Sequence, residues 1–542
     1  MDKYLEWLIN TQNNEKIQEE LIGVKDNAQA IEDRFFKELS FGTGGLRGKI
    51  GAGTNRMNIY SVGKATRGLA KYILNNGIKK SVAIAYDSRN MSEEFSDVAA
   101  QILSQMGIEV YLFDRLMPTP VLSYAVRKLQ TGMGIVITAS HNPKEYNGYK
   151  VYNDKGCQIT DETAVLISQE IANCGYFDEV IGDFSKIHSI GNELLEEFLK
   201  EIKKYSFVDK IENAPKIVYT PLNGTGKEPV KKLFAMMGLQ GYSIVQQQEA
   251  PDGNFTTCPY PNPEEREALS LALELAQSEN AQLVIATDPD ADRVGIAVKD
   301  GQTFRILDGN QTGVLLAEYI FENLKNTQKM PQNPYMVKTI VTTDLAEGIA
   351  QAYGVQTKDV LTGFKYIGET IDNCHKENFI FGMEESYGYL VGTHARDKDA
   401  VSAVMIIVEM VAYYNRQGIT LYEQLKKIYK QYGYYSTKLI SKTFEGKSGM
   451  EYMRNFMQNL RKNPIKEVVG CPALEIKDYA QGIEGLPKSD VIKIICQDVS
   501  MVIRPSGTEP KIKIYLTAKS DTEEKSVALL QQLNEYANGL LS

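Results

Sequence analysis

Three aspartates stand at alternate positions directly after an apolar run, in the segment LVIATDPDADRVG. Carboxylates at this short spacing repel one another, and a hard divalent cation with oxygen ligands is the simplest way to hold them together. A calcium-binding loop does not fit, because Arg293 stands where such a loop needs glycine and Lys299 stands where it needs glutamate. We therefore interpret the triplet as a magnesium site rather than a solvated acidic turn, with the ligands Asp288, Asp290 and Asp292.

A serine is the second candidate, in GIVITASHNPKEYNGYK, where a β-branched run ends in a cluster of polar residues. Ser140 lies in no G-x-S-x-G nucleophile elbow, and the chain has only four histidines, so a hydrolase triad is poorly supported. Taken alone, TASHNP is equally typical of an Asx turn or a helix cap. The interpretation of Ser140 therefore depends on the other candidate groups.

Two segments could bind an anion. FGTGGLRGKIG, residues 41–51, fits neither the Walker pattern nor the dinucleotide spacing. We predict a flexible loop there that presents Arg47 and several N–H groups, with a plain tight turn as the alternative. IRPSGTEPK, residues 503–511, suits a phosphate dianion better than an ordinary hairpin turn. Its donors are Arg504, Ser506, the Gly507 amide and Thr508.

FGMEESYGY places Glu384 and Ser386 at alternate positions after an apolar strand, so both could face one side and bind vicinal sugar hydroxyls. A solvated acidic turn explains these two residues equally well. Lys365 in TGFKYIG and Lys398 in HARDKDA are further candidate ligands, although each alone is more typical of a surface charge. Together, the serine, the carboxylate triplet, the anion loops and the Glu-x-Ser pair indicate phosphoryl transfer on a sugar phosphate.

The elements that position these groups alternate between short β-branched runs and segments of helical period. The runs SVAIAYDSR, GIVITAS, KIVYTPLNG, LVIATDPD and MVKTIVTTD are each followed by turn residues. This pattern predicts α/β organisation with buried strands and with ligands at the strands' C-terminal ends. Near the C-terminus, VIKIICQD, SMVIRPSG and PKIKIYLTAK are closely spaced, which predicts a small α+β domain.

A chain of 542 residues is too long for a single core. Polar stretches divide it into four units, and we predict an α/β domain I with an N-terminal helical extension at 1–190. The other predicted domains are an α/β domain II at 191–304, an α/β domain III at 305–432 and an α+β domain IV at 433–542.

Composition and charge narrow the class of protein. With 43% hydrophobic and 24% charged residues, the chain is typical of a soluble globular protein, and we expect it in the cytoplasm. Its first residues resemble no signal peptide, and the longest apolar run, VSAVMIIVEMVAYY, is too short to span a bilayer and contains Glu409. Six widely spaced cysteines argue against zinc, and a net charge of −9 disfavours a nucleic-acid partner. Nothing here distinguishes a monomer from a dimer.

Five motifs occur in a characteristic order: GTGGLRG, TASHNPKEYNGYK, DPDADR, GMEESYGY and RPSGTEPK. This set resembles the α-D-phosphohexomutase superfamily, and most closely its phosphoglucomutase and phosphopentomutase branch. The resemblance runs from about residue 40 to the C-terminus. It implies four domains around a central cleft, of which three are related α/β domains and the last is a small α+β domain.

The resemblance also implies a role for each candidate residue. Ser140 matches the phosphoserine that gives and regains the phosphoryl group, and its phosphate would complete the magnesium site of the three aspartates. Arg47 and Arg293 match arginines near that phosphate, and Lys150 and His141 match the proton-transfer residues. The remaining matches are Glu384 and Ser386 for the sugar, Arg504, Ser506, Gly507 and Thr508 for the distal phosphate, and Lys365 and Lys398 as further substrate contacts.

By this resemblance the chain is a phosphosugar mutase, an intramolecular phosphotransferase. We expect it to interconvert α-D-glucose 1-phosphate and glucose 6-phosphate through bound glucose 1,6-bisphosphate, which would also act as an activator. Pentose and mannose phosphates stay open as substrates, because they differ from glucose phosphates by only a carbon or a hydroxyl. The attacking sugar hydroxyl must lose a proton, and Lys150 could accept it only if neighbouring cations or burial favoured its neutral amine.

Two other classes stay open. A strand followed by D-x-D also begins the pattern of phosphatases with an aspartyl nucleophile, here Asp288, but Asp292 stands where that pattern expects threonine or valine. A sugar-phosphate sensor without catalysis is the second alternative. The retention of Ser140, Lys150 and the three aspartates argues against it.

Overall fold

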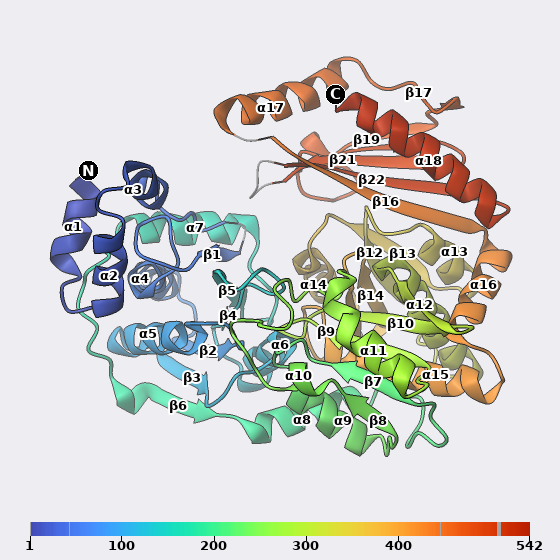
Figure 1. Ribbon diagram of the computed structural model, residues 1–542, viewed down its shortest axis with the longest axis horizontal. Coiled ribbons are helices and arrows are strands. Elements are labelled where there is room, and N and C mark those ends of the chain that lie inside the picture. The colour runs from blue at the N-terminus through green and yellow to red at the C-terminus, as the bar shows by residue number, and fades with distance from the viewer. Residues whose placement is uncertain (1, 43, 445, 507–510, 542) are drawn as a thin grey trace.

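The computed structural model describes residues 2–42, 44–444, 446–506 and 511–541. Four principal sheets follow one another along the chain, and helices cover them (Figure 1). The first three sheets mix parallel and antiparallel strands, and the fourth is wholly antiparallel. The predicted fold class, three α/β domains followed by a small α+β domain, is confirmed.

The first sheet has the strand order β1-β5-β4-β2-β3-β6. Its strands are β1 (Gly45–Lys49), β2 (Ser81–Tyr86), β3 (Glu109–Phe113), β4 (Met133–Ile137), β5 (Tyr146–Asn153) and β6 (Ile187–Ile190). Its helices are α4 (Ile59–Asn75), α5 (Ser92–Gln105), α6 (Thr119–Leu129) and α7 (Asp161–Ala172). Strands β2 and β4 are parallel and buried along their whole length, which explains their unbroken apolar runs.

The segment predicted as a flexible anion loop is in fact an edge strand. Strand β1 pairs with β5 in antiparallel register, with Arg47 opposite Gly148. A Cβ at Gly45 would lie 1.9 Å from the carbonyl oxygen of Tyr149, and the φ of Gly45 is +150°. Only glycine allows this close approach of two backbones, so this glycine serves strand pairing rather than loop flexibility.

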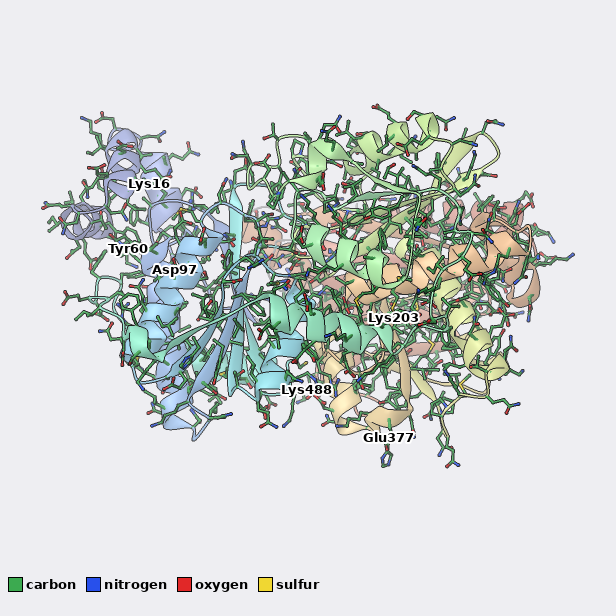
Figure 2. The ribbon with its side chains drawn as sticks, turned by 90° about the horizontal axis from the view of Figure 1, so that it is seen from below. Lys16, Tyr60, Asp97, Lys203, Glu377 and Lys488 are labelled. Carbon is green, nitrogen blue, oxygen red and sulfur yellow. The ribbon has the colours of Figure 1, made fainter. Side chains whose placement is uncertain are left out.

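An N-terminal helical extension packs on the first domain. It consists of α1 (Asp2–Asn10), α2 (Glu15–Gly23) and α3 (Ala28–Phe35). Asn14 and Asn27 cap α2 and α3 by accepting hydrogen bonds from backbone N–H groups in the first turn. The ring of Trp7 packs edge-on against Phe35 and against Tyr60, which Figure 2 labels beside this extension. The extension therefore has its own small aromatic core.

The second sheet has the order β11-β10-β9-β7-β8 and the third has the order β13-β12-β14-β15. The strands of the second sheet are β7 (Ile217–Thr220), β8 (Tyr242–Ile244), β9 (Leu283–Thr287), β10 (Val294–Asp300) and β11 (Thr303–Leu307), with helices α8 (Asn192–Lys203), α9 (Lys227–Met236), α10 (Gln246–Glu249) and α11 (Ser270–Ser278). The third sheet consists of β12 (Tyr335–Thr339), β13 (Gln356–Val360), β14 (Phe379–Glu384) and β15 (Gly388–Val391). Its helices are α12 (Gly309–Asn326), α13 (Leu345–Ala352), α14 (Phe364–Asn373), α15 (Ala400–Arg416) and α16 (Leu421–Tyr432).

One pattern recurs in these three sheets. A strand that is parallel to its neighbour ends in a short loop, and the chain then returns as an antiparallel strand: β4 to β5, β9 to β10, and β14 to β15. The serine, aspartate and glutamate motifs occupy these three loops in turn. The repeated hairpin therefore brings each functional motif to the same edge of its own sheet.

The longest apolar run lies in α15, where it is buried as predicted. Helix α15 belongs to a core cluster that joins residues from the first three sheets. Within the described ranges, no helix has the length and apolar character to cross a membrane.

The C-terminal sheet has the order β16-β22-β21-β20-β19. Its strands are β16 (Tyr434–Thr443), β19 (Glu475–Asp478), β20 (Ile492–Ile495), β21 (Val499–Pro505) and β22 (Lys511–Ser520), with helices α17 (Gly446–Lys462) and α18 (Glu523–Leu540) and a small hairpin of β17 (Glu467–Val468) and β18 (Cys471–Pro472). The residues of β22 alternate between buried and partly exposed, as in a sheet with one covered face. The sheet lies apart from the first domain and beside the third (Figure 1).

Candidate active site

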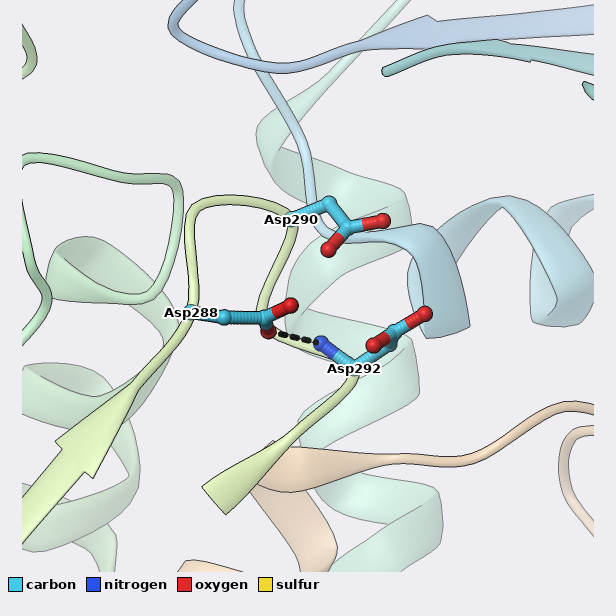
Figure 3. A group of neighbouring side chains, drawn as sticks. All are labelled: Asp288, Asp290 and Asp292. Atoms are coloured by element: carbon cyan, nitrogen blue, oxygen red, sulfur yellow. Dashed lines mark hydrogen bonds between the residues drawn. The ribbon is translucent and has the colours of Figure 1, made fainter. Parts of the chain in front are cut away.

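The three aspartates lie together in the loop from β9 to β10, as Figure 3 shows. One oxygen of each carboxylate lies within 4.8 Å of the others, and all three residues are buried. The loop is folded on Asp288, whose Oδ1 accepts hydrogen bonds from the N–H groups of Asp292 at 3.1 Å and Arg293 at 2.9 Å. The carboxylates therefore converge on one point by the local fold of their own loop.

The electrostatics of the triplet fit a divalent cation. Among the described residues, neither Asp290 Oδ1 nor Asp292 Oδ1 has a hydrogen-bond partner, although both atoms are buried. Burial, and then the charges of Asp290 and Asp292, raise the pKa of the Asp288 carboxyl well above its usual range. A bound Mg²⁺ would take the unpartnered oxygens and reverse this penalty, so the residues present suit the ion that the sequence predicts.

Ser140 lies beside the triplet, in the loop from β4 to β5. Its hydroxyl donates a hydrogen bond to Asp288 Oδ2 at 2.8 Å, and its N–H donates to Thr138 Oγ1 at 2.8 Å. The backbone at Ser140 has a φ of +54°, which is rare for a residue other than glycine and typical of strained functional turns. The structure thus brings together two motifs that are 148 residues apart in the sequence.

His141 Nδ1 lies 3.2 Å from the Ser140 hydroxyl oxygen. Burial, and then the charges of Arg293 and Arg47, lower the pKa of the His141 imidazole well below its usual value. The ring is therefore neutral at physiological pH, and one of its nitrogens can accept a proton at the serine.

Two lysines neutralise the triplet from opposite domains. Lys150 Nζ on β5 donates to Asp290 Oδ2 at 3.0 Å and lies 3.7 Å from Asp292 Oδ2. Lys398 Nζ, in the loop before α15, lies 2.8 Å from the same Asp292 oxygen. The neighbours of Lys150 are thus carboxylates and not the cations that the sequence-based hypothesis for its neutral amine required.

The two predicted arginines lie near this group in different ways. Arg293 Nη1 pairs with Glu264 Oε1 at 3.0 Å, and its Nε lies 3.9 Å from Asp292 Oδ1. Arg47 is exposed on β1, and its charge acts on His141 across the sheet edge. Both guanidinium groups therefore add positive potential on the serine side of the triplet.

Glu384 ends β14 and is buried, and its Oε1 accepts a hydrogen bond from the Gly363 N–H at 2.9 Å. Burial, and then the charge of Glu385, raise the pKa of Glu384 to about 7. Ser386 lies in the turn that follows and is half-buried. The charge of Lys398 also acts on Glu384, so the glutamate loop faces the same group of charges as the aspartate loop.

The other predicted substrate contacts lie farther along the third and fourth domains. Lys365, at the start of α14, pairs with Asp161 of α7 at 2.5 Å and so links the third domain to the first. Arg504 and Ser506 lie at the end of β21 and just after it, where the charge of Arg504 acts on Glu385. Gly507 and Thr508 lie outside the described residues.

The sequence analysis missed Thr119. It is buried at the start of α6, and its hydroxyl donates to Asp290 Oδ2 at 2.9 Å while its N–H donates to the Asp290 carbonyl at 2.9 Å. A threonine between two prolines in MPTPVL carries no local signal for such a contact. Residues that support the site from another domain become visible only in the fold.

A three-dimensional group of serine, histidine, carboxylate triplet and flanking cations, held at the edges of three α/β domains, defines a phosphoryl-transfer enzyme. Four family models, described as the α/β/α domains I, II and III and the C-terminal domain of phosphoglucomutase/phosphomannomutase, match residues 38–176, 196–301, 308–432 and 460–529. The chain belongs to the phosphoglucomutase/phosphomannomutase family. It is a mutase, an intramolecular phosphotransferase of the isomerase class, and the predicted superfamily is confirmed.

Relatives and solved structures agree with this assignment. A protein from Staphylococcus haemolyticus named phosphoglucomutase is 38% identical over 519 residues, covering 91% of this chain and 93% of its own length. A phosphoglucomutase from Staphylococcus aureus is 37% identical over 511 residues, covering 90% of this chain and 91% of its own. The fold is similar to that of a putative phosphomannomutase from Thermus thermophilus, at TM-score 0.72 and 23% identity, covering 93% of this chain and 99% of the other. It is also similar to the open form of a phosphoglucomutase, pp63/parafusin, from Paramecium, at TM-score 0.73 and 16% identity, covering 93% and 94%.

Proposed function

We propose that this mutase interconverts α-D-glucose 1-phosphate and glucose 6-phosphate, with Ser140 as the carrier of the phosphoryl group. The observation that supports the carrier role most directly is the 2.8 Å hydrogen bond from the Ser140 hydroxyl to a buried aspartate of the triplet. The choice of glucose is supported by the relatives named phosphoglucomutase, at 36–38% identity over most of the chain.

Asp288, Asp290 and Asp292 would hold Mg²⁺, with an oxygen of the Ser140 phosphate completing the site. The ion would supply positive charge for the oxygens of the transferred phosphoryl group. Arg293 and Arg47 add to this charge from the protein. Since phosphoryl transfer needs mainly in-line positioning and neutralised oxygens, these cations would supply most of the stabilisation of the transition state.

In the forward direction the O6 hydroxyl of glucose 1-phosphate attacks the phosphorus on Ser140. The new O6–P bond forms, the bond from phosphorus to Ser140 Oγ breaks, and the O6 proton leaves as Oγ gains one. We assign these proton transfers to His141 and Lys150, of which His141 is the better acceptor because its pKa is lowered and Nδ1 lies 3.2 Å from Oγ.

Glucose 1,6-bisphosphate must then reorient, so that the O1 phosphoryl group returns to Ser140 and glucose 6-phosphate is released. Either end of the sugar must fit the same distal loop, to which we assign Arg504, Ser506, Gly507 and Thr508. We assign Glu384 and Ser386 to the sugar hydroxyls, and Lys365 and Lys398 to the bound substrate. Added bisphosphate would phosphorylate Ser140 directly and so act as an activator.

The domain boundaries at residues 190, 304 and 432 are also proposals. A central cleft among the four domains, a location in the cytoplasm, and the absence of nucleic-acid and membrane partners stay predictions from the sequence, and the oligomeric state, monomer or dimer, is open. None of these enters the chemistry proposed for the site.

A panel of sugar 1-phosphates tests the substrate. Glucose, mannose and ribose 1-phosphates are assayed with Mg²⁺ and a trace of the matching bisphosphate, and kcat/KM is compared. We expect the highest kcat/KM for glucose 1-phosphate. A large preference for ribose or mannose 1-phosphate would overturn the choice of glucose and leave the mutase class intact.

A further inference from the structure

One arginine holds the backbone of the serine loop from below. Arg89 lies just after β2, is 3% exposed, and directs its guanidinium under the loop from β4 to β5. Its Nη2 donates hydrogen bonds to the carbonyl oxygens of Ser140 and, at 2.5 Å, of Asn142. Its Nη1 donates to the carbonyl oxygens of Pro143 at 3.0 Å and Tyr146 at 3.2 Å. Four of its five N–H donors are therefore used on four carbonyls of one loop.

Arg89 is itself held in place by a buried carboxylate. Asp87 Oδ2 lies 3.3 Å from Arg89 Nε, and Asp87 Oδ1 accepts from the Arg89 N–H at 2.9 Å and from the Ser92 hydroxyl at 2.7 Å. Both side chains of the pair are fully buried, and the ring of Phe255 lies 5.0 Å from the guanidinium carbon. The guanidinium is thus fixed before it meets the serine loop.

The direction of these bonds sets the direction of the loop's amides. In a trans peptide the N–H points opposite to the C=O, so the peptide that turns the Ser140 carbonyl toward Arg89 turns the His141 N–H away from it. Within the part of the chain that the structure describes, the His141 N–H has no acceptor. Arg89 therefore holds one free backbone donor directly beside Ser140, on the face of the loop away from the guanidinium.

The same contact stabilises an unfavourable backbone. Ser140 has a φ of +54°, and a residue other than glycine in such a conformation costs about 1–3 kcal/mol unless the surroundings hold it. The carbonyl of Ser140 is bonded to Arg89 and its N–H to Thr138 Oγ1, so both peptide groups of the strained residue are fixed. Loss of Arg89 would free one of them.

We propose that Arg89 is the positioning residue of this mutase, holding the four loop carbonyls inward so that Ser140 Oγ and the His141 amide are aligned for the phosphoryl group. The proposal rests on the proposed role of Ser140. Arg89 touches neither substrate nor metal in this account, and it acts through the loop alone. Its fork geometry matters as well as its charge, because a lysine ammonium cannot reach four carbonyls in fixed directions.

The test compares Arg89→Lys with a matched control, Arg67→Lys. Arg67 is also buried, donates to the backbone carbonyl of Asp178 and pairs with its carboxylate at 3.5 Å, but it lies on α4 away from the serine loop. We expect Arg89→Lys to lower kcat by about 100-fold, the size of loss that misplacing a reacting group produces, with KM for glucose 1-phosphate changed less than about 3-fold. Arg67→Lys should keep both constants at the wild-type values.

A spectroscopic measurement separates positioning from general destabilisation. The ³¹P resonance of the phosphorylated enzyme should shift or broaden in Arg89→Lys and stay unchanged in Arg67→Lys. If Arg89→Lys does not fold, Asp87→Asn, which removes the countercharge of the guanidinium, should lower kcat in the same sense but by less. Wild-type kcat in the variant that folds would overturn the proposal, as would a fall in kcat with an unchanged ³¹P signal.

Failure of this proposal is distinguishable from failure of the proposed function. If the wild-type enzyme carries phosphate on Ser140 and Arg89→Lys turns over at the wild-type rate, only the role of Arg89 is wrong. If wild-type Ser140 is never phosphorylated, the carrier role is wrong and the role of Arg89 is wrong with it.

Discussion

Replacing Thr119 by valine should weaken magnesium binding while leaving the fold intact. The substitution exchanges a buried hydroxyl for a methyl group of similar size and removes the 2.9 Å hydrogen bond to Asp290 Oδ2. The backbone contact from residue 119 to the Asp290 carbonyl is retained, because it uses the N–H group. Only the support of one ligand side chain is therefore lost.

The size of the effect follows from the bond that is removed. A hydrogen bond to a charged group contributes about 1.5–3 kcal/mol, and each 1.4 kcal/mol corresponds to about tenfold in a dissociation constant. Loss of a group that supports a metal ligand typically costs about 10–100-fold in affinity. We therefore expect Thr119→Val to raise the Kd for Mg²⁺ by about 10–100-fold, with kcat largely recovered at saturating Mg²⁺.

The assay is initial rate against free Mg²⁺ concentration, with calorimetric titration of Mg²⁺ into the enzyme as a direct check. Thr66→Val is the matched control, since Thr66 is a buried threonine whose hydroxyl donates to the Val62 carbonyl and to the Tyr149 hydroxyl instead of to a ligand. Equal Mg²⁺ dependence in Thr119→Val and the wild type would refute the reasoning. So would an equal loss of affinity in Thr66→Val.

Three further predictions concern charge and packing. Since burial raises the pKa of Glu384 to about 7, kcat/KM should fall as the pH decreases through 7 and Glu384 takes up a proton, and Glu384→Gln should lose this dependence; pH profiles of both enzymes check it. Burial likewise raises the pKa of Glu409 to about 7, so the folded state holds a proton that the unfolded chain releases above pH 4.5, and the free energy of unfolding should fall by up to about 3 kcal/mol between pH 4.5 and 7. Urea unfolding at the two pH values should show this slope for the wild type and a weaker one for Glu409→Gln. Trp7→Ala removes the centre of the N-terminal aromatic core, where Trp7 is 1% exposed, and should cost about 3–5 kcal/mol of unfolding free energy in the same assay, whereas a loss below about 1 kcal/mol would mean that the extension is not packed as described.

Local sequence signals were sufficient for the elements and for the motifs at their ends. The apolar runs before Ser140 and Asp288 are buried strands, and the run containing Glu409 is a buried helix, because unbroken apolar sequence is stable only where both faces are covered. The α+β character of the C-terminal region followed from the short spacing of its strands. Here periodicity and length carried the information.

Contacts between distant segments could not be predicted in this way. The segment around Arg47 is glycine-rich, a feature that suggests a loop, yet its glycine serves close pairing of β1 with a strand about 100 residues later. Thr119 lies 171 residues from Asp290, and Arg89 lies 51 residues from Ser140. Neither has a motif of its own, although Arg89 shares one signal with the known candidates, a polar group just after a buried β-branched strand.

The central claim is that Ser140 carries the phosphoryl group, and the most direct measurement is the chemical identity of the phosphorylated residue. The enzyme is incubated with glucose 1,6-bisphosphate carrying ³²P, quenched and digested, and the labelled peptide is sequenced. We predict an acid-stable phosphoserine at Ser140, which is discharged by unlabelled glucose 1-phosphate at a rate at least equal to kcat and is absent from Ser140→Ala. An acyl phosphate on Asp288 that hydroxylamine removes, or full turnover by Ser140→Ala, would contradict the account.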